Sequence, residues 1–153
     1  MGAMSLLETL SAGTVIGLDT AAFIYFIEEH PLYEPLLSPL FEQRIERGEN
    51  RAVTSVVTLA EVLVQPKRLA RDDLAQRYRE FLTAGANLML VDITAAVAER
   101  AATLRAQHNL RLPDAIQVAA AIEHGAAYFI TNDTRLRRLT EPTVVILDDY
   151  LHG

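Results

Sequence analysis

Cysteine is absent from the 153 residues of the chain, and Lys67 is the single lysine among fourteen basic residues. Without cysteine, disulfide bonds, thiolate catalysis and zinc-thiolate sites are excluded. Apolar runs are short and interrupted by charged residues, so no membrane span is expected. The sequence also does not open with the basic segment followed by an apolar segment that is typical of a signal peptide. We therefore expect a cytoplasmic protein without a signal peptide.

The net charge of −6 at pH 7 disfavours a general nucleic-acid binder with a wide basic surface. The arginines nevertheless gather locally, and a planar guanidinium matches phosphate oxygens. An arginine rim around an acidic pocket is one interpretation, and solvated helix faces with ion pairs four residues apart are the other. The two clusters are Lys67, Arg68 and Arg71, and Arg135, Arg137 and Arg138.

The length and composition fit a single folded domain. Half of the residues are apolar and 22% are charged, which is an ordinary globular balance. A chain of this size buries roughly two thirds of the surface that its unfolded form exposes. We expect residues 1–4 to be a remnant that precedes a native Met4, residues 5–150 to form the domain, and residues 151–153 to be a tail.

The stretch 112–133 is the most informative part of the sequence. Pro113 favours a helix start and places Asp114 in the first turn, and Gly125 can take the left-handed conformation that ends a helix. The run 128–131 is β-branched and aromatic, which is typical of a buried strand. Turn-forming Asn132 and Asp133 follow it. The pattern predicts a buried helix, a strand and an acidic turn.

The rest of the chain repeats this alternation of strands and helices. The segment after residue 54 is ambiguous because valine favours strands, but Ser55 can cap a helix, so we predict a helix that Pro66 ends. Such alternation indicates an α/β fold of three layers, with a mostly parallel sheet of about five strands covered on both faces. The predicted strands are 15–18, 52–54, 88–91, 128–131 and 144–147, and the predicted helices are 21–29, 33–48, 55–65, 71–83, 95–108, 113–124 and 135–139.

Four acidic residues stand where solubility does not require them. Asp19 and Asp133 follow predicted strands, and Asp114 begins a helix. Each has a structural explanation, as an N-cap, a turn residue or a partner of the helix dipole. Glu61 lies among apolar residues that would draw it inward, where its structural explanation is a buried pair with an arginine. An α/β sheet brings strand ends and helix starts to one edge, so we expect the four to converge.

Converging carboxylates repel one another unless a cation neutralises them. Oxygen ligands without histidine or cysteine suit Mg²⁺ or Mn²⁺, which keeps several waters and uses substrate phosphate as a further ligand. His30, His108 and His124 are interpreted as helix-end or surface residues. The carboxylates therefore predict a divalent metal site.

Four segments carry a family resemblance, in order and spacing, over residues 15–147. They read L-D-T at 18–20, T-S-V-V-T-L-A-E-V-L at 54–63, L-P-D-A-I-Q-V-A-A-A at 112–121 and F-I-T-N-D at 129–133. The chain resembles PIN-domain ribonucleases and, among these, the VapC-type toxins of bacterial toxin-antitoxin pairs. One departure from the family pattern is the run Thr20-Ala21-Ala22, because members often have a polar residue after Asp-Thr or Asp-Ser, and this implies a missing contact beside the metal ligands.

The resemblance implies a metal-dependent endoribonuclease. Asp19, Glu61, Asp114 and Asp133 match the acidic quartet that holds Mg²⁺ or Mn²⁺ and carries the catalysis. In that mechanism Asp19 and Asp114 bind the metal, and the other two hold a second metal or orient the attacking water. The expected substrate contacts are Thr131, Asn132, Arg111 and Arg135.

The resemblance also implies partners, namely an RNA substrate, a cognate antitoxin and a second copy of the chain in a homodimer. Apolar residues of 33–45 or 74–82 are expected either at the dimer interface or in the core. Three other functions are considered: a PIN-like RNA-processing nuclease outside a toxin system, a non-catalytic RNA- or protein-binding module of the same fold, and a phosphotransferase of the haloacid-dehalogenase type. The last requires Asp-x-Asp, and Ala21 stands at the second acidic position.

Overall fold

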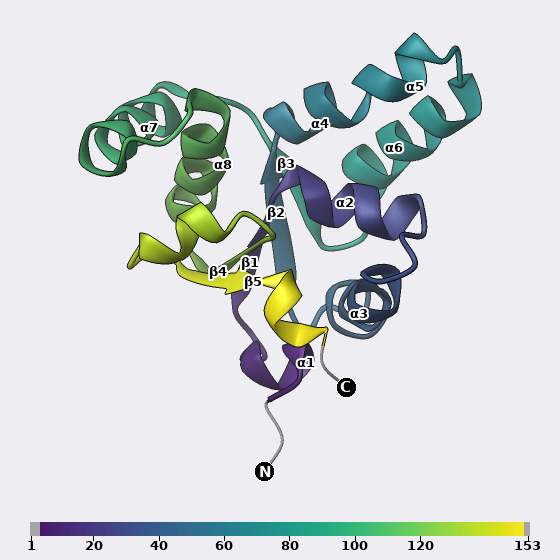
Figure 1. Ribbon diagram of the computed structural model, residues 1–153, viewed down its shortest axis with the longest axis horizontal. Helices are drawn as coiled ribbons and strands as arrows, with labels where there is room; N and C mark the ends of the chain where they lie inside the picture. The colour runs from purple at the N-terminus through teal and green to yellow at the C-terminus, as the bar shows by residue number, and fades with distance from the viewer. Residues whose placement is uncertain (1–3, 152–153) are drawn as a thin grey trace.

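A computed structural model describes residues 4–151 of the chain. The expected remnant and tail therefore lie outside the described residues, except for Met4 and Leu151. Within the described range, five strands form one sheet in the order β3-β2-β1-β4-β5, and every pairing is parallel. The sheet is shown nearly edge-on in Figure 1. The strands are β1 (Val15–Leu18), β2 (Arg51–Ser55), β3 (Leu88–Val91), β4 (Ala126–Thr131) and β5 (Thr143–Ile146).

The strand order reverses at β1. The chain lays β2 and β3 in turn on one side of β1 and then crosses over to lay β4 and β5 on the other side. In parallel sheets, a crevice opens outside the carboxyl ends of the two strands at which the order reverses. Those strands are β1 and β4, and the carboxylates of Asp19 and Asp133 follow them directly.

Helices cover both faces of the sheet, as Figure 1 shows. Helices α7 and α8 pack together on one face, where α8 contacts β1, β2 and β4. The segments that connect β1 to β2 and β2 to β3 cover the other face. The helical elements are α1 (Leu6–Thr9), α2 (Thr20–Ile27), α3 (Glu34–Pro39), the π-helix η1 (Leu40–Ile45), α4 (Val56–Val62), α5 (Val64–Arg68), α6 (Asp72–Ala84), α7 (Ala95–His108), α8 (Leu112–Glu123), and the 3₁₀ turns η2 (Thr134–Arg138) and η3 (Leu147–Tyr150).

Local signals set several of the helix starts. The side chains of Asp19, Ser55 and Thr94 cap α2, α4 and α7 by accepting hydrogen bonds from backbone amides two or three residues further along the chain. Gly125 has the left-handed φ of +75° that was expected after α8. The three-layer α/β prediction is confirmed, and the sheet is wholly parallel rather than mostly so.

Pro66 does not end the helix that follows β2. That helix, α4, stops at Val62, and Pro66 lies inside the next short helix, α5. Proline is tolerated in the first turn of a helix because the amide it lacks would have no helical partner there. None of the helices within residues 4–151 is long and apolar enough to cross a bilayer.

Two apolar clusters, one on each face of the sheet, form the core. The cluster beside α2 contains Phe23, Phe41 and Tyr78, and the cluster beside α7 and α8 includes several alanines of α8. Gly17 of β1 permits the close approach of α8, because a Cβ at this position would lie 2.7 Å from the Cβ of Ala121. This close packing holds the last turn of α8 against β1.

The apolar residues of 33–45 and 74–82 mostly belong to the core. Leu37, Leu40, Leu74 and Leu82 are all buried. The two expectations for these segments were a dimer interface and the core, and for these four residues the core is confirmed. The large apolar residues that are exposed within the described chain lie elsewhere: Met4, Leu32, Val64, Leu69, Met89, Ile93 and Leu112.

Candidate active site

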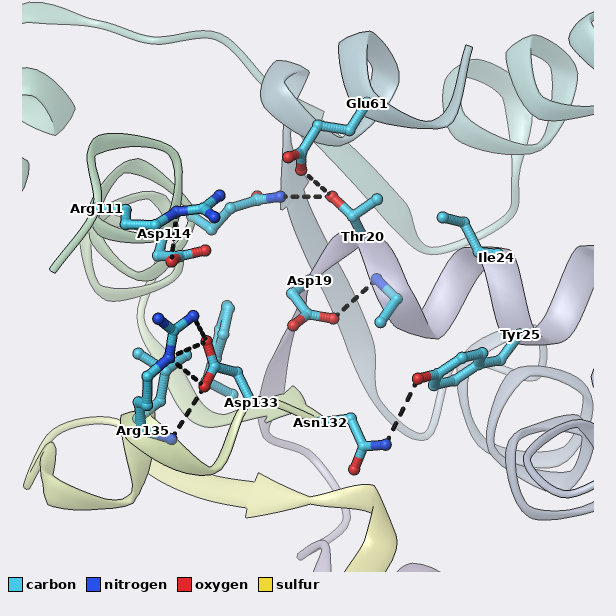
Figure 2. A pocket seen from close by; sticks show the side chains of 14 residues that line it. Asp19, Thr20, Ile24, Tyr25, Glu61, Arg111, Asp114, Asn132, Asp133 and Arg135 are labelled. Atoms are coloured by element: carbon cyan, nitrogen blue, oxygen red, sulfur yellow. Dashed lines mark hydrogen bonds and ion pairs between the residues drawn. The ribbon is translucent and has the colours of Figure 1, made fainter. Parts of the chain in front are cut away.

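A pocket of about 530 Å³ opens at the carboxyl ends of β1 and β4, where the strand order reverses. Figure 2 shows acidic side chains from four different parts of the chain around this opening. All four acidic residues of the predicted quartet line it, together with the predicted contacts Asn132, Arg111 and Arg135. The acidic residues are Asp19, Glu61, Asp114 and Asp133.

Asp19 lies at the floor of the pocket. One carboxylate oxygen accepts a hydrogen bond of 3.0 Å from the amide of Ala21, and the other accepts one from the hydroxyl of Thr131. Burial raises the pKa of Asp19 to about 6, although these hydrogen bonds oppose the rise, and the charge of Asp114 adds to it. Asp19 therefore caps α2, as the structural explanation had it, and also belongs to a cluster of interacting carboxylates.

Asp114 projects from the first turn of α8. The guanidinium of Arg111 lies 3.6 Å from its carboxylate, and 29% of the Asp114 side chain is exposed toward the pocket. Burial raises the pKa of Asp114, the cations of Arg111 and Arg135 oppose this rise, and the anions of Asp133 and Glu61 add to it. The quartet thus interacts electrostatically, and the arginines compensate only part of the repulsion.

Asp133 is held by a close ion pair. It caps η2 through the amide of Arg135 at 3.0 Å, and the Arg135 guanidinium grips both carboxylate oxygens, with a shortest distance of 2.6 Å. These contacts lower the pKa of Asp133. Because the Arg135 side chain is 65% exposed, a phosphate entering the pocket can compete for the guanidinium.

Glu61 is exposed at the pocket and is not drawn into the interior as expected. The residues of α4 that are buried are Thr58 and Val62, so the helix turns Glu61 toward the opening. The Glu61 carboxylate accepts a 2.5 Å hydrogen bond from the hydroxyl of Thr20. The expected alternative, a buried pair with arginine, is therefore wrong, and Thr20 itself supplies a polar contact beside the quartet.

Sequence reasoning missed a buried polar network behind Thr20 and Glu61. The side-chain amide of Gln117 donates to Thr20 at 3.1 Å and to Thr58 at 2.7 Å, and its carbonyl accepts from Ser55 at 2.8 Å. Gln117 is 5% exposed and fully partnered, so it orients the hydroxyl that holds Glu61. A signal was available in principle, since Gln117 is the one polar residue in an otherwise apolar stretch of α8.

Thr131 and Asn132 take different positions. Thr131 is fully buried, with its hydroxyl bonded to Asp19 and accepting from the amide of Asp133 at 3.1 Å. It is therefore not placed for the direct substrate contact that was predicted, and it orients Asp19 instead. Asn132 does line the pocket, where its amide faces the hydroxyl of Tyr25 (Figure 2).

The donor set fits a hard divalent cation. It consists of carboxylate oxygens alone, and burial raises the pKa values of two of the carboxyls, Asp19 and Asp114. Within residues 4–151, no three acidic or histidine side chains stand close enough together to enclose a metal ion. Mg²⁺ does not require such a cage, since it is usually held by one or two carboxylates and several waters.

The fold and the site together define a class of protein: an α/β protein with an acidic pocket at the point where its strand order reverses. The sequence matches the PIN domain family over residues 16–142. This match spans most of the chain, and the chain therefore belongs to the PIN-domain family. Nucleases of this family generally use divalent metal ions. Comparison with curated protein sequences gives no match.

Solved structures with the same fold include several toxin-antitoxin proteins. A chain of a toxin-antitoxin complex from Klebsiella pneumoniae is 27% identical, with a TM-score of 0.65, covering 88% of this chain and 98% of that one. A chain of DNA-bound VapBC from Salmonella typhimurium is 19% identical, with a TM-score of 0.66 and the same coverage. VapC20 of Mycobacterium tuberculosis, a toxin that cleaves the sarcin-ricin loop, is 15% identical, with a TM-score of 0.61, covering 76% of this chain and 87% of that one.

Proposed function

We propose that this chain is a metal-dependent endoribonuclease that hydrolyses RNA phosphodiester bonds, and that it is the toxin of a type II toxin-antitoxin pair. The observation that carries the proposal is the convergence of Asp19, Glu61, Asp114 and Asp133 on one pocket with two arginines at its rim. Carboxylates that lie close together repel one another. A module that only binds RNA gains nothing from such a cluster, whereas a cation-dependent nuclease requires the carboxylates to hold its cation.

In this proposal Asp19 and Asp114 hold Mg²⁺ or Mn²⁺. When bound there, the cation lowers the pKa of a water molecule and polarises the phosphoryl oxygen. Thr131 keeps the Asp19 carboxylate oriented through its hydroxyl. Glu61, held by Thr20, and Asp133 are placed across the pocket to orient the attacking water or a second cation.

The arginine rim supplies the substrate contacts. Arg111 and Arg135 line the pocket beside Asp114 and Asp133, and both side chains are more than half exposed. A guanidinium presents a fork of donors that fits two phosphate oxygens. We assign these two residues to the RNA backbone on one side of the cleaved bond.

The proposed partners are a cognate antitoxin and a second copy of the chain. Support for the antitoxin comes from the toxin-antitoxin complex of Klebsiella pneumoniae, whose chain is 27% identical and is matched over 98% of its length. As the toxin of such a pair, the protein would act on RNA in the cytoplasm. Co-purification with the product of the neighbouring gene, followed by a mass measurement of the complex, tests both partners.

RNA cleavage by the Asp114→Asn variant tests the catalytic part. The wild type is expected to cleave RNA with Mg²⁺ or Mn²⁺ and to lose this activity in EDTA, and Asp114→Asn is expected to lose at least about a hundredfold in rate while remaining folded. Asp72→Asn is the matched control, since Asp72 lies in the first turn of α6, away from the pocket. Unchanged cleavage by Asp114→Asn refutes the assignment.

Two alternatives predict different results. A PIN-like nuclease outside a toxin system cleaves RNA but does not co-purify with an antitoxin. A non-catalytic module of the same fold binds RNA or protein without cleaving, and Mn²⁺ leaves its thermal unfolding unchanged because no cation is held. An increase in melting temperature with Mn²⁺ that disappears in Asp114→Asn is expected for the enzyme.

A further inference from the structure

Four side chains form a closed ring on one flank of the pocket. Tyr25 of α2 stacks on Tyr33, with ring centroids 4.2 Å apart and an interplanar angle of 18°. The hydroxyl of Tyr33 donates to the carboxylate of Asp148. The backbone amide of Asp148 donates to the side-chain carbonyl of Asn132 at 2.9 Å. The side-chain amide of Asn132 donates a hydrogen bond of 3.5 Å to the hydroxyl of Tyr25 and so closes the ring. Segments far apart in sequence thus support one another here.

The ring presents hydrogen-bond donors to the pocket. Asn132 and Tyr25 both line the pocket. The Asn132 side-chain carbonyl is occupied by the backbone amide of Asp148, and its amide nitrogen makes a long hydrogen bond to the Tyr25 hydroxyl and also interacts with the Tyr33 hydroxyl. Within residues 4–151, no acceptor is placed to take the proton of the Tyr25 hydroxyl. The Tyr25 hydroxyl proton is therefore available to an acceptor oxygen of a ligand, and the Asn132 amide can exchange its long bond to Tyr25 for one to the same ligand.

This flank lies across the carboxylates from the arginine rim. In Figure 2, Tyr25 and Asn132 lie on one side of Asp19, while Arg111 and Arg135 lie on the other. The arginine side offers cations for phosphate, and the Tyr25 side offers neutral donors next to the apolar side chain of Ile24. An RNA strand that crosses the carboxylates would meet two chemically different flanks.

We propose that Tyr25 and Asn132 form a nucleotide subsite, in which the Tyr25 hydroxyl and the Asn132 amide donate hydrogen bonds to a base or ribose oxygen of the nucleotide next to the cleaved bond. This inference rests on the proposed nuclease function. Tyr33 and Asp148 are positioning residues: the stacked ring of Tyr33 fixes Tyr25, and Asp148 fixes both Tyr33 and Asn132.

Removal of the Tyr25 hydroxyl tests the subsite. The probe is the single-stranded RNA that the wild type cleaves fastest from a random pool, labelled with fluorescein, and binding is measured by anisotropy in the Asp114→Asn background. Tyr25→Phe is expected to weaken binding about five- to tenfold, the size of one or two lost hydrogen bonds. With Asp114 intact, the same factor should appear in KM, with kcat nearly unchanged.

Tyr128→Phe is the matched control. The Tyr128 hydroxyl bonds to the amide of Ser11 at 3.2 Å and does not line the pocket, so this variant should bind like the wild type. Tyr33→Phe keeps the stacked ring and removes the link to Asp148. It should weaken binding less than Tyr25→Phe does, because it loosens the subsite without removing a donor.

Two altered RNAs identify the acceptor. In one, the nucleotide beside the cleaved bond lacks its base, and in the other it lacks the 2′-hydroxyl. The effect of Tyr25→Phe should vanish with the RNA that lacks the acceptor. If the effect persists with both RNAs, or if Tyr25→Phe binds as tightly as Tyr128→Phe while the wild type cleaves RNA, the subsite is refuted and the nuclease stands. A wild type that neither binds nor cleaves RNA refutes both.

Discussion

The metal-free protein should become more stable when Asp19 is replaced by asparagine, and the gain should depend on pH. The pKa of Asp19 is raised to about 6 from an ordinary value of 3.8 because the folded chain buries the carboxyl. Between these two values the folded state binds more protons than the unfolded state, so stability falls as the pH rises. The loss is absent below about pH 3.8 and complete above about pH 6.

A difference of roughly two pH units corresponds to about 3 kcal/mol of unfolding free energy. Asparagine carries no charge, and it caps a helix as well as aspartate does. Asp19→Asn should therefore gain about 2–3 kcal/mol at pH 7.5, or roughly 5–10 °C in melting temperature for a chain of this size. At pH 4 the gain should be below about 1 kcal/mol.

Urea unfolding in EDTA at pH 4 and pH 7.5 measures both differences. Asp73→Asn is the control, because Asp73 is an exposed carboxylate whose pKa is lowered by its pairing with Arg71, and its removal should bring no gain. If Asp19→Asn is less stable than the wild type at pH 7.5, or shifts stability equally at both pH values, the burial argument is wrong. Loss of RNA cleavage in the same variant would show that the carboxylate that lowers stability is the one that cleavage requires.

Three further substitutions probe the supports of the site. Gln117→Met should lower the free energy of unfolding in urea by about 2 kcal/mol, because it leaves buried hydroxyls without a partner. It should also lower kcat. The control Gln76→Met, at an exposed position, should change neither quantity. Gly17→Ala should cost about 1–3 kcal/mol, since its Cβ would lie 2.9 Å from the Phe129 ring as well as close to α8, and an unchanged urea midpoint would contradict this tight packing. Arg135→Ala should raise the pKa of Asp133, followed by NMR, and should weaken RNA binding while reducing its salt dependence; equal salt slopes would remove Arg135 from the phosphate contacts.

The strands and helix starts followed from signals that act within a few residues. Asp19 and Asp133 end strands and cap the next turn, and these preferences depend on the local backbone alone. Convergence of the quartet at one pocket followed from a general rule for parallel sheets, without any knowledge of the partners of each side chain. This part of the site could be predicted because topology alone brings it together.

The orientation of α4 could not be read from its sequence. The apolar pattern favoured a buried Glu61, whereas the structure buries Thr58 and exposes Glu61. Thr58 is buried because Gln117, 59 positions further along the chain, donates to it, and the hydrogen-bonding partner of a buried threonine leaves no trace in the local pattern. The same limit applies to the ring around Tyr25 and Asn132, whose members come from distant segments.

The central position of β1 has a consequence for folding during synthesis on the ribosome. Asp19 and Glu61 lie in the first half of the chain, and Asp114 and Asp133 in the second, so the quartet is complete only when α8 and β4 have docked beside β1. A polypeptide still emerging from the ribosome lacks Asp114 and Asp133 until α8 and β4 have been synthesised. The proposed nuclease would thus be unable to assemble its site, and to cut RNA near the ribosome, before β4 has emerged and paired with β1.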